Sequence, residues 1–398
     1  MLLNPDNNSM IDFFYKQNYP RDTFSSHSCI EKIYLHLKGD EPYRFVTTSS
    51  RGPQDIFYKV TKITKSEEIP LSKNLKLSEV ASQKMINYIH RMTFGVTFEY
   101  VMDGRKITIY IVDSHDKLND FKIYVIQMLK VIRMLTHFSH KSCTKSSSFT
   151  IYIYFTPFSK ILPLKSLSID ADSINTGVNI KDRLCSPNEH LNEIIIYREE
   201  DWFKVFIHES IHSFRLDFQS NGKSEIMKIY KVKSEVNLFE SYTEFWAEFI
   251  NIMVCAILLE KHGKFANVIK IMTLMIHIEI LFGFFQVVKL LRHMGLTYAE
   301  LIEGGKFSLK YTEKTNVLSY FIIKLIFMNN FNSFLLFCEK YGHNILDFNE
   351  ENLPFLFEFI KNRYTDSSFI KKIEHFEKIN TVDKTLMKTT KMTLFELK

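Results

Sequence analysis

Two histidines and a glutamate stand at a spacing that suits metal chemistry. His208, Glu209 and His212 form an HExxH motif in a segment rich in apolar residues. On a helix, residues four apart lie on one face one turn above each other, so both imidazoles can reach a single metal ion. Glu209 is turned about 100° away, which lets its carboxylate hold a water molecule beside the metal without binding the metal itself. Imidazole and carboxylate donors suit Zn²⁺.

The alternative is that the two histidines share a helix by coincidence. The apolar residues around the motif predict a largely buried helix. Without a metal, that helix would have to satisfy three polar side chains in some other way, because buried polar groups that lack partners are costly. We therefore favour the metal site.

A second segment carries a stripe of three acids, Glu240, Glu244 and Glu248, each four residues after the last. Apolar residues at helical spacing predict that the stripe borders the buried face of a helix. Like charges at this spacing repel, and no Lys or Arg lies between residues 234 and 260 to relieve the repulsion. A cation that faces the stripe would resolve the conflict, and a plain acidic face is the alternative.

These two segments together resemble the gluzincin branch of the zincin metallopeptidases, in which an HExxH helix is followed by a helix that bears a glutamate and a second acid one turn later. The run of residues 244–248, EFWAE, is similar to the matching run of the lethal factor-type catalytic domain and of predicted proteases of large DNA viruses. The resemblance implies that Glu244 joins His208 and His212 as a zinc ligand and that Glu248 supports a ligating histidine. The register that uses Glu240 as the ligand, followed by Glu244, is the alternative.

The resemblance also implies an activity. It predicts a zinc-dependent metallopeptidase that hydrolyses peptide bonds with a zinc-activated water, with Glu209 as general base and a protein or peptide as substrate. A group from the second lobe would stabilise the oxyanion, and the sequence offers four candidates: Tyr230, Tyr242, His277 and His293. Arg215 and Asp217 stand where the longer metzincin motif would continue, which excludes that branch. The alternative function is a catalytically inactive zincin-fold protein that binds partners or is virion-associated.

The elements that must position these residues change in character along the chain. Alternating apolar residues on both sides of Asp103-Gly104 predict a hairpin over 96–112, and residues 149–155 and 192–197 read as further strands. Helical periodicity covers residues 117–138 and almost everything after residue 201. The strand at 192–197 fits either the core or the edge of the sheet.

This order predicts an α+β fold. The resemblance makes it zincin-like, with an N-terminal twisted mixed sheet with helices followed by a mainly helical C-terminal lobe. We expect an N-terminal region of unclear fold over 1–90, a sheet subdomain with the active-site helix over 91–218, and a helical lobe carrying the third zinc ligand over 219–398.

Composition limits the partners and the setting. The 398 residues are 45% hydrophobic and 24% charged, which is typical of a globular protein, and the net charge of +6 gives little reason to expect nucleic acid as a partner. Five cysteines without a CxxC pair, and no visible signal peptide, favour a reducing, cytoplasmic location. The apolar run 271–291 contains His277, Glu279 and Gln286, so we expect a buried helix and no transmembrane segment. The Lys-rich C-terminal stretch is expected to be solvated.

Overall fold

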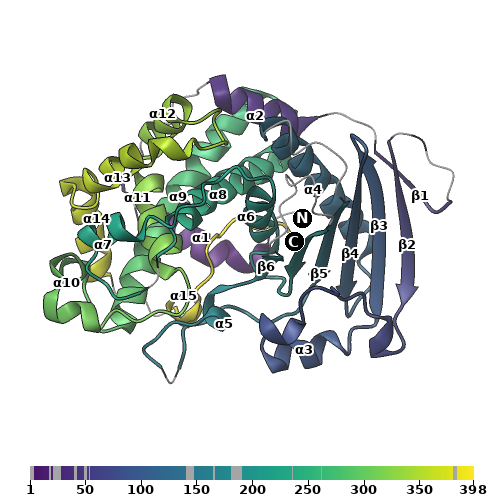
Figure 1. The fold of residues 1–398 in the computed structure, drawn as a ribbon, viewed down its shortest axis with the longest axis horizontal. Helices are drawn as coiled ribbons and strands as arrows, with labels where there is room; N and C mark the ends of the chain where they lie inside the picture. Colours follow the sequence, from purple (N-terminus) through teal and green to yellow (C-terminus); the bar gives the residue numbers. More distant parts are fainter. Residues whose placement is uncertain are drawn as a thin grey trace.

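The computed structural model describes residues 4–17, 19–20, 28–39, 43–48, 52, 54–139, 148–164, 166–180, 191–234, 236–260, 262–379 and 383–398. The fold is α+β, with 55% helix and one seven-stranded mixed sheet. The sheet lies on one side of the molecule and the C-terminal helices lie on the other, with helix α6 between them (Figure 1). The mixed sheet followed by helices agrees with the α+β prediction.

The sheet has the strand order β1-β2-β3-β4-β5-β7-β6. β1 pairs in parallel with β2, β4 with β5 and β5 with β7, while the other neighbours are antiparallel. The strands are β1 (Arg44–Val46), β2 (Asp55–Lys62), β3 (Phe94–Met102), β4 (Arg105–Asp113), β5 (Ser148–Tyr154), β6 (Gly177–Ile180) and β7 (Leu191–Ile196).

The predicted hairpin is confirmed as β3 and β4. Met102 pairs with Arg105, and the two residues between them, Asp103 and Gly104, have φ angles of 51° and 80°. A two-residue turn with both central residues in the left-handed region matches the twist of the flanking strands, and Asp-Gly is a favoured pair for it.

Alternation along the strands separates two apolar layers. Ile151 and Ile153 of β5 belong to the main core, while Tyr152 and Tyr154 face a smaller cluster on the opposite side of the sheet. That smaller cluster is closed by residues from the segment 63–92, which includes helix α3. Because both faces of the sheet are covered here, the inner strands β5 and β7 contain largely apolar runs.

The strand expected over 192–197 is β7, and it is an interior strand because it pairs with β5 on one side and β6 on the other. The edge belongs to β6, which lies in a stretch whose sequence predicts only irregular structure. β6 has four residues and no clear alternation, so its pairing depends on β7 and not on a pattern of its own. Among the described strands it has β7 as its only partner.

The α-helices of the described chain are α1 (Asn8–Tyr15), α2 (Ser28–Lys38), α3 (Gln83–Ile89), α4 (Leu118–Phe138), α5 (Ala171–Ile174), α6 (Trp202–Ser213), α7 (Lys223–Ile229), α8 (Leu238–Leu259), α9 (Phe265–His293), α10 (Tyr298–Glu303), α11 (Lys324–Asn329), α12 (Phe331–Tyr341), α13 (Leu353–Lys361), α14 (Ser367–Lys378) and α15 (Lys384–Lys388). A π-helical segment, η6 (Leu318–Ile323), precedes α11, and short 3-10 helices cover Pro5–Asn7, Ser66–Glu68, Leu77–Glu79, Gly305–Leu309 and Glu350–Asn352.

The first ninety residues are integrated with the rest of the fold. Strand β2 pairs with β3, α2 packs on α4, and α1 packs on α9. Apolar side chains from residues 1–90, 91–218 and 219–398 all join one hydrophobic cluster.

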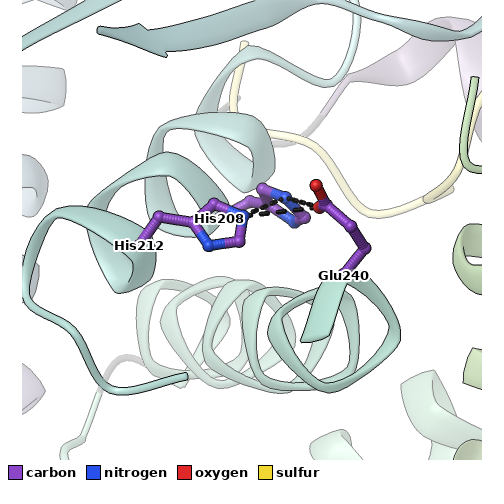
Figure 2. A group of neighbouring side chains, drawn as sticks. All are labelled: His208, His212 and Glu240. Atoms are coloured by element: carbon purple, nitrogen blue, oxygen red, sulfur yellow. Dashed lines mark hydrogen bonds and ion pairs between the residues drawn. The ribbon is translucent and has the colours of Figure 1, made fainter. Parts of the chain in front are cut away.

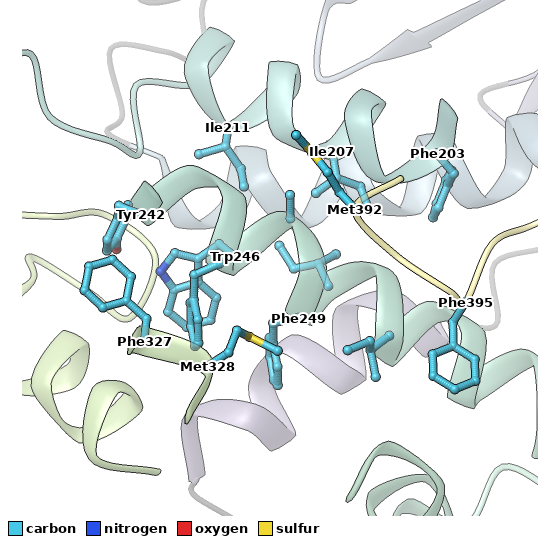
Figure 3. Packing of buried hydrophobic residues seen from close by; sticks show 14 of the residues in the cluster. Phe203, Ile207, Ile211, Tyr242, Trp246, Phe249, Phe327, Met328, Met392 and Phe395 are labelled. Carbon is cyan, nitrogen blue, oxygen red and sulfur yellow. The ribbon is translucent and has the colours of Figure 1, made fainter. Parts of the chain in front are cut away.

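The C-terminal segment, residues 389–397, is buried, so the expectation of a solvated terminus is wrong. Met392 and Phe395 lie among the apolar side chains of α6 and α8 (Figure 3). Its polar groups have partners inside the fold: Lys391 Nζ lies 2.7 Å from Glu396 Oε2, and Glu279 Oε1 accepts hydrogen bonds from the backbone N–H groups of Leu394 and Phe395. These partners make burial of Lys391 and Glu396 tolerable, while Lys384, Lys388 and Lys398 of the same stretch are exposed.

Helices α8 and α9 are long and apolar enough to cross a membrane, and the bent pair Leu318–Asn329 and Phe331–Tyr341 passes the same test of length and composition. Within the fold, 83% of the apolar window of α8 and 72% of that of α9 are buried. Both helices thus bury most of this apolar surface against other parts of the protein.

Candidate metal centre

Helices α6 and α8 set two polar stripes against each other. The α6 stripe is Lys204, His208 and His212, and the α8 stripe is Glu240, Glu244 and Glu248. His212 lies near Glu240, His208 contacts both Glu240 and Glu244, and Lys204 contacts Glu244. The pairing order is reversed along the two helices, so they run antiparallel where the stripes meet.

Apolar packing beside the stripes fixes this alignment. Ile207 and Ile211 of α6 are buried on the side that faces α8, while Trp246 and Phe249 are buried on the side of α8 away from α6, near Phe327 and Met328 (Figure 3). At the start of α6, Asp201 accepts hydrogen bonds from Lys160 Nζ at 2.6 Å and from the backbone N–H of Met392 at 2.9 Å. Helix α6 is therefore held both along its length and at its first turn.

Three donor atoms for a metal converge between the helices (Figure 2). His208 Nε2 lies 3.0 Å from His212 Nε2 and 3.0 Å from Glu240 Oε2, and His212 Nε2 lies 3.4 Å from the same Glu240 oxygen. Among the residues that the structure describes, these three side chains are the group with ligand atoms close enough to share an ion, all within 4.8 Å of one another.

The ring nitrogens on the far side from the shared site, Nδ1 of His208 and Nδ1 of His212, each face a carboxylate. His208 Nδ1 lies 3.0 Å from Glu244 Oε2, and His212 Nδ1 lies 2.7 Å from Asp217 Oδ2. An ionised carboxylate only accepts hydrogen bonds, so each Nδ1 carries a proton, and whenever a ring is neutral its Nε2 presents a lone pair. The two lone pairs and a carboxylate oxygen then face one another, and such a group of acceptors needs a cation between its members.

A proton or a divalent metal can serve as that cation. Burial alone would lower the pKa of His208, but the hydrogen bonds that its ring donates to Glu240 and Glu244 raise it above its ordinary value. Burial likewise opposes the charged form of His212, and the carboxylates of Asp217 and Glu240 raise its pKa well above the ordinary value. The donor set of two imidazoles and one carboxylate fits Zn²⁺ with a coordination position left open.

Glu240, and not Glu244, occupies the position that the preferred register assigned to the third ligand. Glu240 faces the space between the two histidines, whereas Glu244, one helical turn later, faces the space between His208 and Lys204. Burial favours the neutral form of both acids, but the two histidines hold the pKa of Glu240 well below its usual range, and Lys204 and His208 do the same for Glu244. The geometry thus corresponds to the alternative register, which is shifted by one turn.

Glu248, expected to support a histidine, lies one turn too far along α8 for that role. Its carboxylate is fully buried, and its nearest described cation is Lys324, whose Nζ lies 3.7 Å from Glu248 Oε2. Burial raises the pKa of Glu248 above the ordinary value. The support of a histidine that was expected of Glu248 is instead given by Glu244, which contacts Nδ1 of His208.

Glu209 borders a cavity of about 650 Å³ that opens beside the two histidines. The cavity is lined by edge strand β6, by the end of α6, by the start of α8 and by Tyr320 of η6. Asn179 of β6 donates hydrogen bonds to the Glu209 backbone carbonyl at 2.9 Å and to Ser213 Oγ at 2.8 Å, which ties the edge strand to the helix. Burial raises the pKa of the Glu209 carboxyl.

The four tyrosines and histidines considered for oxyanion stabilisation do not line this cavity. Tyr230 hydrogen-bonds Tyr298 at 2.8 Å, Tyr242 donates to the Leu346 carbonyl at 3.0 Å, and His293 contacts the Ser166 carbonyl at 2.9 Å. His277 lines a separate cavity between α9 and α12.

Tyr320 lines the cavity instead, with its ring centroid 5.9 Å from that of His208. It lies within an apolar run, VLSYFIIK, and nothing in that run distinguishes it from a core tyrosine. Only the packing of η6 on α8 brings it to the histidines.

A role for Asp217 at the site was also not predicted from the sequence, where this residue served only to exclude the metzincin motif. It reaches back to His212 because the chain turns sharply after α6, where Arg215 adopts a left-handed φ of 52°. A hint was available in the sequence, since Asp217 is an acid five residues after the second histidine.

No family model, no curated protein and no solved structure matches this chain. The arrangement of the side chains is therefore the main evidence on what the site does.

Proposed function

We propose that this protein is a zinc-dependent metallopeptidase with a zincin-like fold. The observation that carries the proposal is the convergence of His208 Nε2, His212 Nε2 and Glu240 Oε2 at the wall of a cavity that Glu209 also lines. His208, His212 and Glu240 would hold the ion, and two nitrogens with one oxygen form a donor set typical of catalytic zinc. When bound, the zinc ion supplies Lewis acidity, which lowers the pKa of water and polarises a carbonyl group.

Glu209 fits the role of general base. Its carboxylate lines the cavity one residue after His208 and is turned away from the ligand stripe. It would accept a proton from the attacking water and deliver that proton to the departing amine. Its raised pKa matches this double role, because a carboxyl that both accepts and returns a proton works best with a pKa nearer neutrality.

Edge strand β6 and Tyr320 complete the proposed cleft. Gly177, Val178 and Asn179 of β6 line the cavity, and an extended peptide could add to this strand by backbone hydrogen bonds. The Tyr320 hydroxyl would donate a hydrogen bond to the oxyanion that forms when the peptide carbonyl is attacked. Burial raises the pKa of Tyr320 well above its ordinary value, which keeps the hydroxyl protonated and able to donate.

Hydrolysis of casein or of a peptide library, with and without a chelator, tests this proposal. We expect the wild-type activity to be lost with chelator and restored by zinc, and the Glu209→Gln variant to be inactive while it keeps its zinc. Glu225→Gln, the same change on exposed helix α7, is the control and should remain active. A fully active Glu209→Gln variant would overturn the mechanism. Zinc uptake by a wild-type protein that cleaves nothing would favour the alternative, a metal-stabilised interaction module.

A further inference from the structure

Lys204 is a buried cation immediately behind the candidate metal centre. Its side chain is 1% exposed, and its ammonium group donates to Glu244 Oε1 and, at 3.2 Å, to the sulfur of Met392. It stands one helical turn before His208, so the α6 stripe has cation, imidazole and imidazole at successive turns. Taking an ammonium group out of water costs several kcal/mol, so its place here calls for a compensating role.

Glu244 links this lysine to the metal centre. One of its carboxylate oxygens accepts from Lys204, and the other lies 3.0 Å from Nδ1 of His208. A carboxylate bound at one oxygen only can still rotate about its last bond, whereas one that is bound at both oxygens has a fixed plane. The plane of Glu244 in turn sets the orientation of the His208 ring.

We propose that Lys204 is a positioning residue that fixes the His208 ring for zinc through the Glu244 carboxylate. The inference rests on the proposed zinc site and extends it by one further group. Partners of ligating histidines commonly change metal affinity by about 10- to 100-fold when they are removed. Lys204 acts one step further out, and its effect must pass through Glu244.

The buried C-terminal segment holds the lysine in place. Met392 offers its sulfur to Lys204, and its backbone N–H donates to Asp201 Oδ2 at 2.9 Å. Asp201 is the residue before α6 and also binds Lys160, so the segment is tied to the start of the active-site helix. The ammonium group of Lys204 is thus confined between α8 on one side and the C-terminal segment on the other.

Zinc affinity, measured by competition with a chromophoric chelator, tests the inference. We expect Lys204→Met to bind zinc about 10-fold more weakly or worse and to lose kcat with little change in KM. Lys289→Met is the matched control, because it removes a similarly buried lysine amino group that donates to the backbone carbonyls of Leu386 and Thr389 and whose described contacts include neither Glu244 nor Asp201. It should lose stability but keep its zinc affinity. Lys204→Gln, which retains a donor for Glu244, should fall between wild type and Lys204→Met, and it serves if the methionine variant does not fold.

Repeating the Lys204→Met change in the Glu244→Gln variant shows whether Lys204 positions His208 through Glu244 or only stabilises the fold. In Glu244→Gln the route to His208 is already broken, so adding Lys204→Met should cost no further zinc affinity. The inference is overturned if Lys204→Met binds zinc as tightly as Lys289→Met and the wild type, or if its loss persists undiminished in the Glu244→Gln background. Either result, with a wild type that binds zinc and hydrolyses peptides, leaves the proposed function intact. A wild type that binds no zinc would overturn both.

Discussion

The two histidines of the candidate centre are supported in different ways. His208 is backed by Glu244, and Glu244 is neutralised by Lys204, with side chains 7%, 2% and 1% exposed, respectively. His212 is backed by Asp217 on the turn that follows α6, and these two side chains are 18% and 14% exposed. One support is part of a helix-helix interface, and the other borders the cavity.

Because of this difference, we expect the two supports to contribute unequally to the stability of the fold. Removing one partner of a buried, charge-compensated pair leaves an unmatched charge in the interior, which costs far more than losing a pair that water can reach. We therefore expect the His208 side to anchor the fold of the site. The His212 side should affect the metal with little effect on folding.

The largest effect on the stability of the site should come from Glu244→Gln. The change leaves the Lys204 ammonium buried without its counter-charge, so we expect the metal-free protein to lose about 3–5 kcal/mol of unfolding free energy. Urea denaturation in the presence of a chelator measures this loss. A loss below about 1 kcal/mol would mean that Lys204 and Glu244 are not a buried pair.

The pH dependence of stability should differ between the metal-free and zinc-loaded protein. Both histidines have a folded-state pKa above the ordinary value of 6.5. Their protonation therefore stabilises the metal-free protein fully below about pH 6.5, and this contribution is lost as the pH rises through the raised folded-state values. Zinc requires the neutral imidazoles, so its binding should strengthen over the same range.

Melting temperatures from pH 6 to 9, with chelator and with zinc, measure this difference. We expect the metal-free protein to become less stable relative to the zinc-loaded form as the pH rises. Asp217→Asn should flatten the metal-free dependence, since Asp217 is the foremost group that raises the pKa of His212. If the difference in melting temperature between the zinc-loaded and metal-free protein narrows as the pH rises, the raised pKa values of the histidines are contradicted.

The smallest effect on stability should come from Asp217→Asn. Its pair with His212 is partly open to water, so we expect a loss of about 1 kcal/mol or less in unfolding free energy. Zinc affinity should nevertheless fall about 10- to 100-fold, because Asp217 orients the outer nitrogen of a ligating ring. A chelator competition assay on both Asp217→Asn and Glu244→Gln shows whether the two variants lose zinc affinity to a similar extent. Their unfolding free energies should nevertheless differ.

The local elements could be predicted from the sequence, since each depends on its own periodicity. The β3–β4 hairpin follows from Asp103-Gly104 between alternating residues, and α4, α6 and α8 follow from helical spacing. The short edge strand β6 carries no pattern of its own and was missed.

The register of α8 against α6 could not be predicted, because three glutamates four residues apart are equivalent along a helix. Which of them meets the histidines depends on the axial offset between two packed helices, and that offset is a property of the packed pair α6 and α8 that neither segment specifies alone. The burial of the C-terminal segment depends in the same way on a distant residue, Glu279. Long-range packing decided both outcomes.

Zinc content after purification and dialysis, compared between wild type, Glu240→Gln and Glu244→Gln, tests the central claim most directly. We expect the wild type to hold one zinc ion per chain, Glu240→Gln to hold none, and Glu244→Gln to take up zinc with weakened affinity. A wild type that takes up no zinc, or a Glu240→Gln variant that keeps its zinc while Glu244→Gln loses it, would contradict the assignment of His208, His212 and Glu240 as the metal centre.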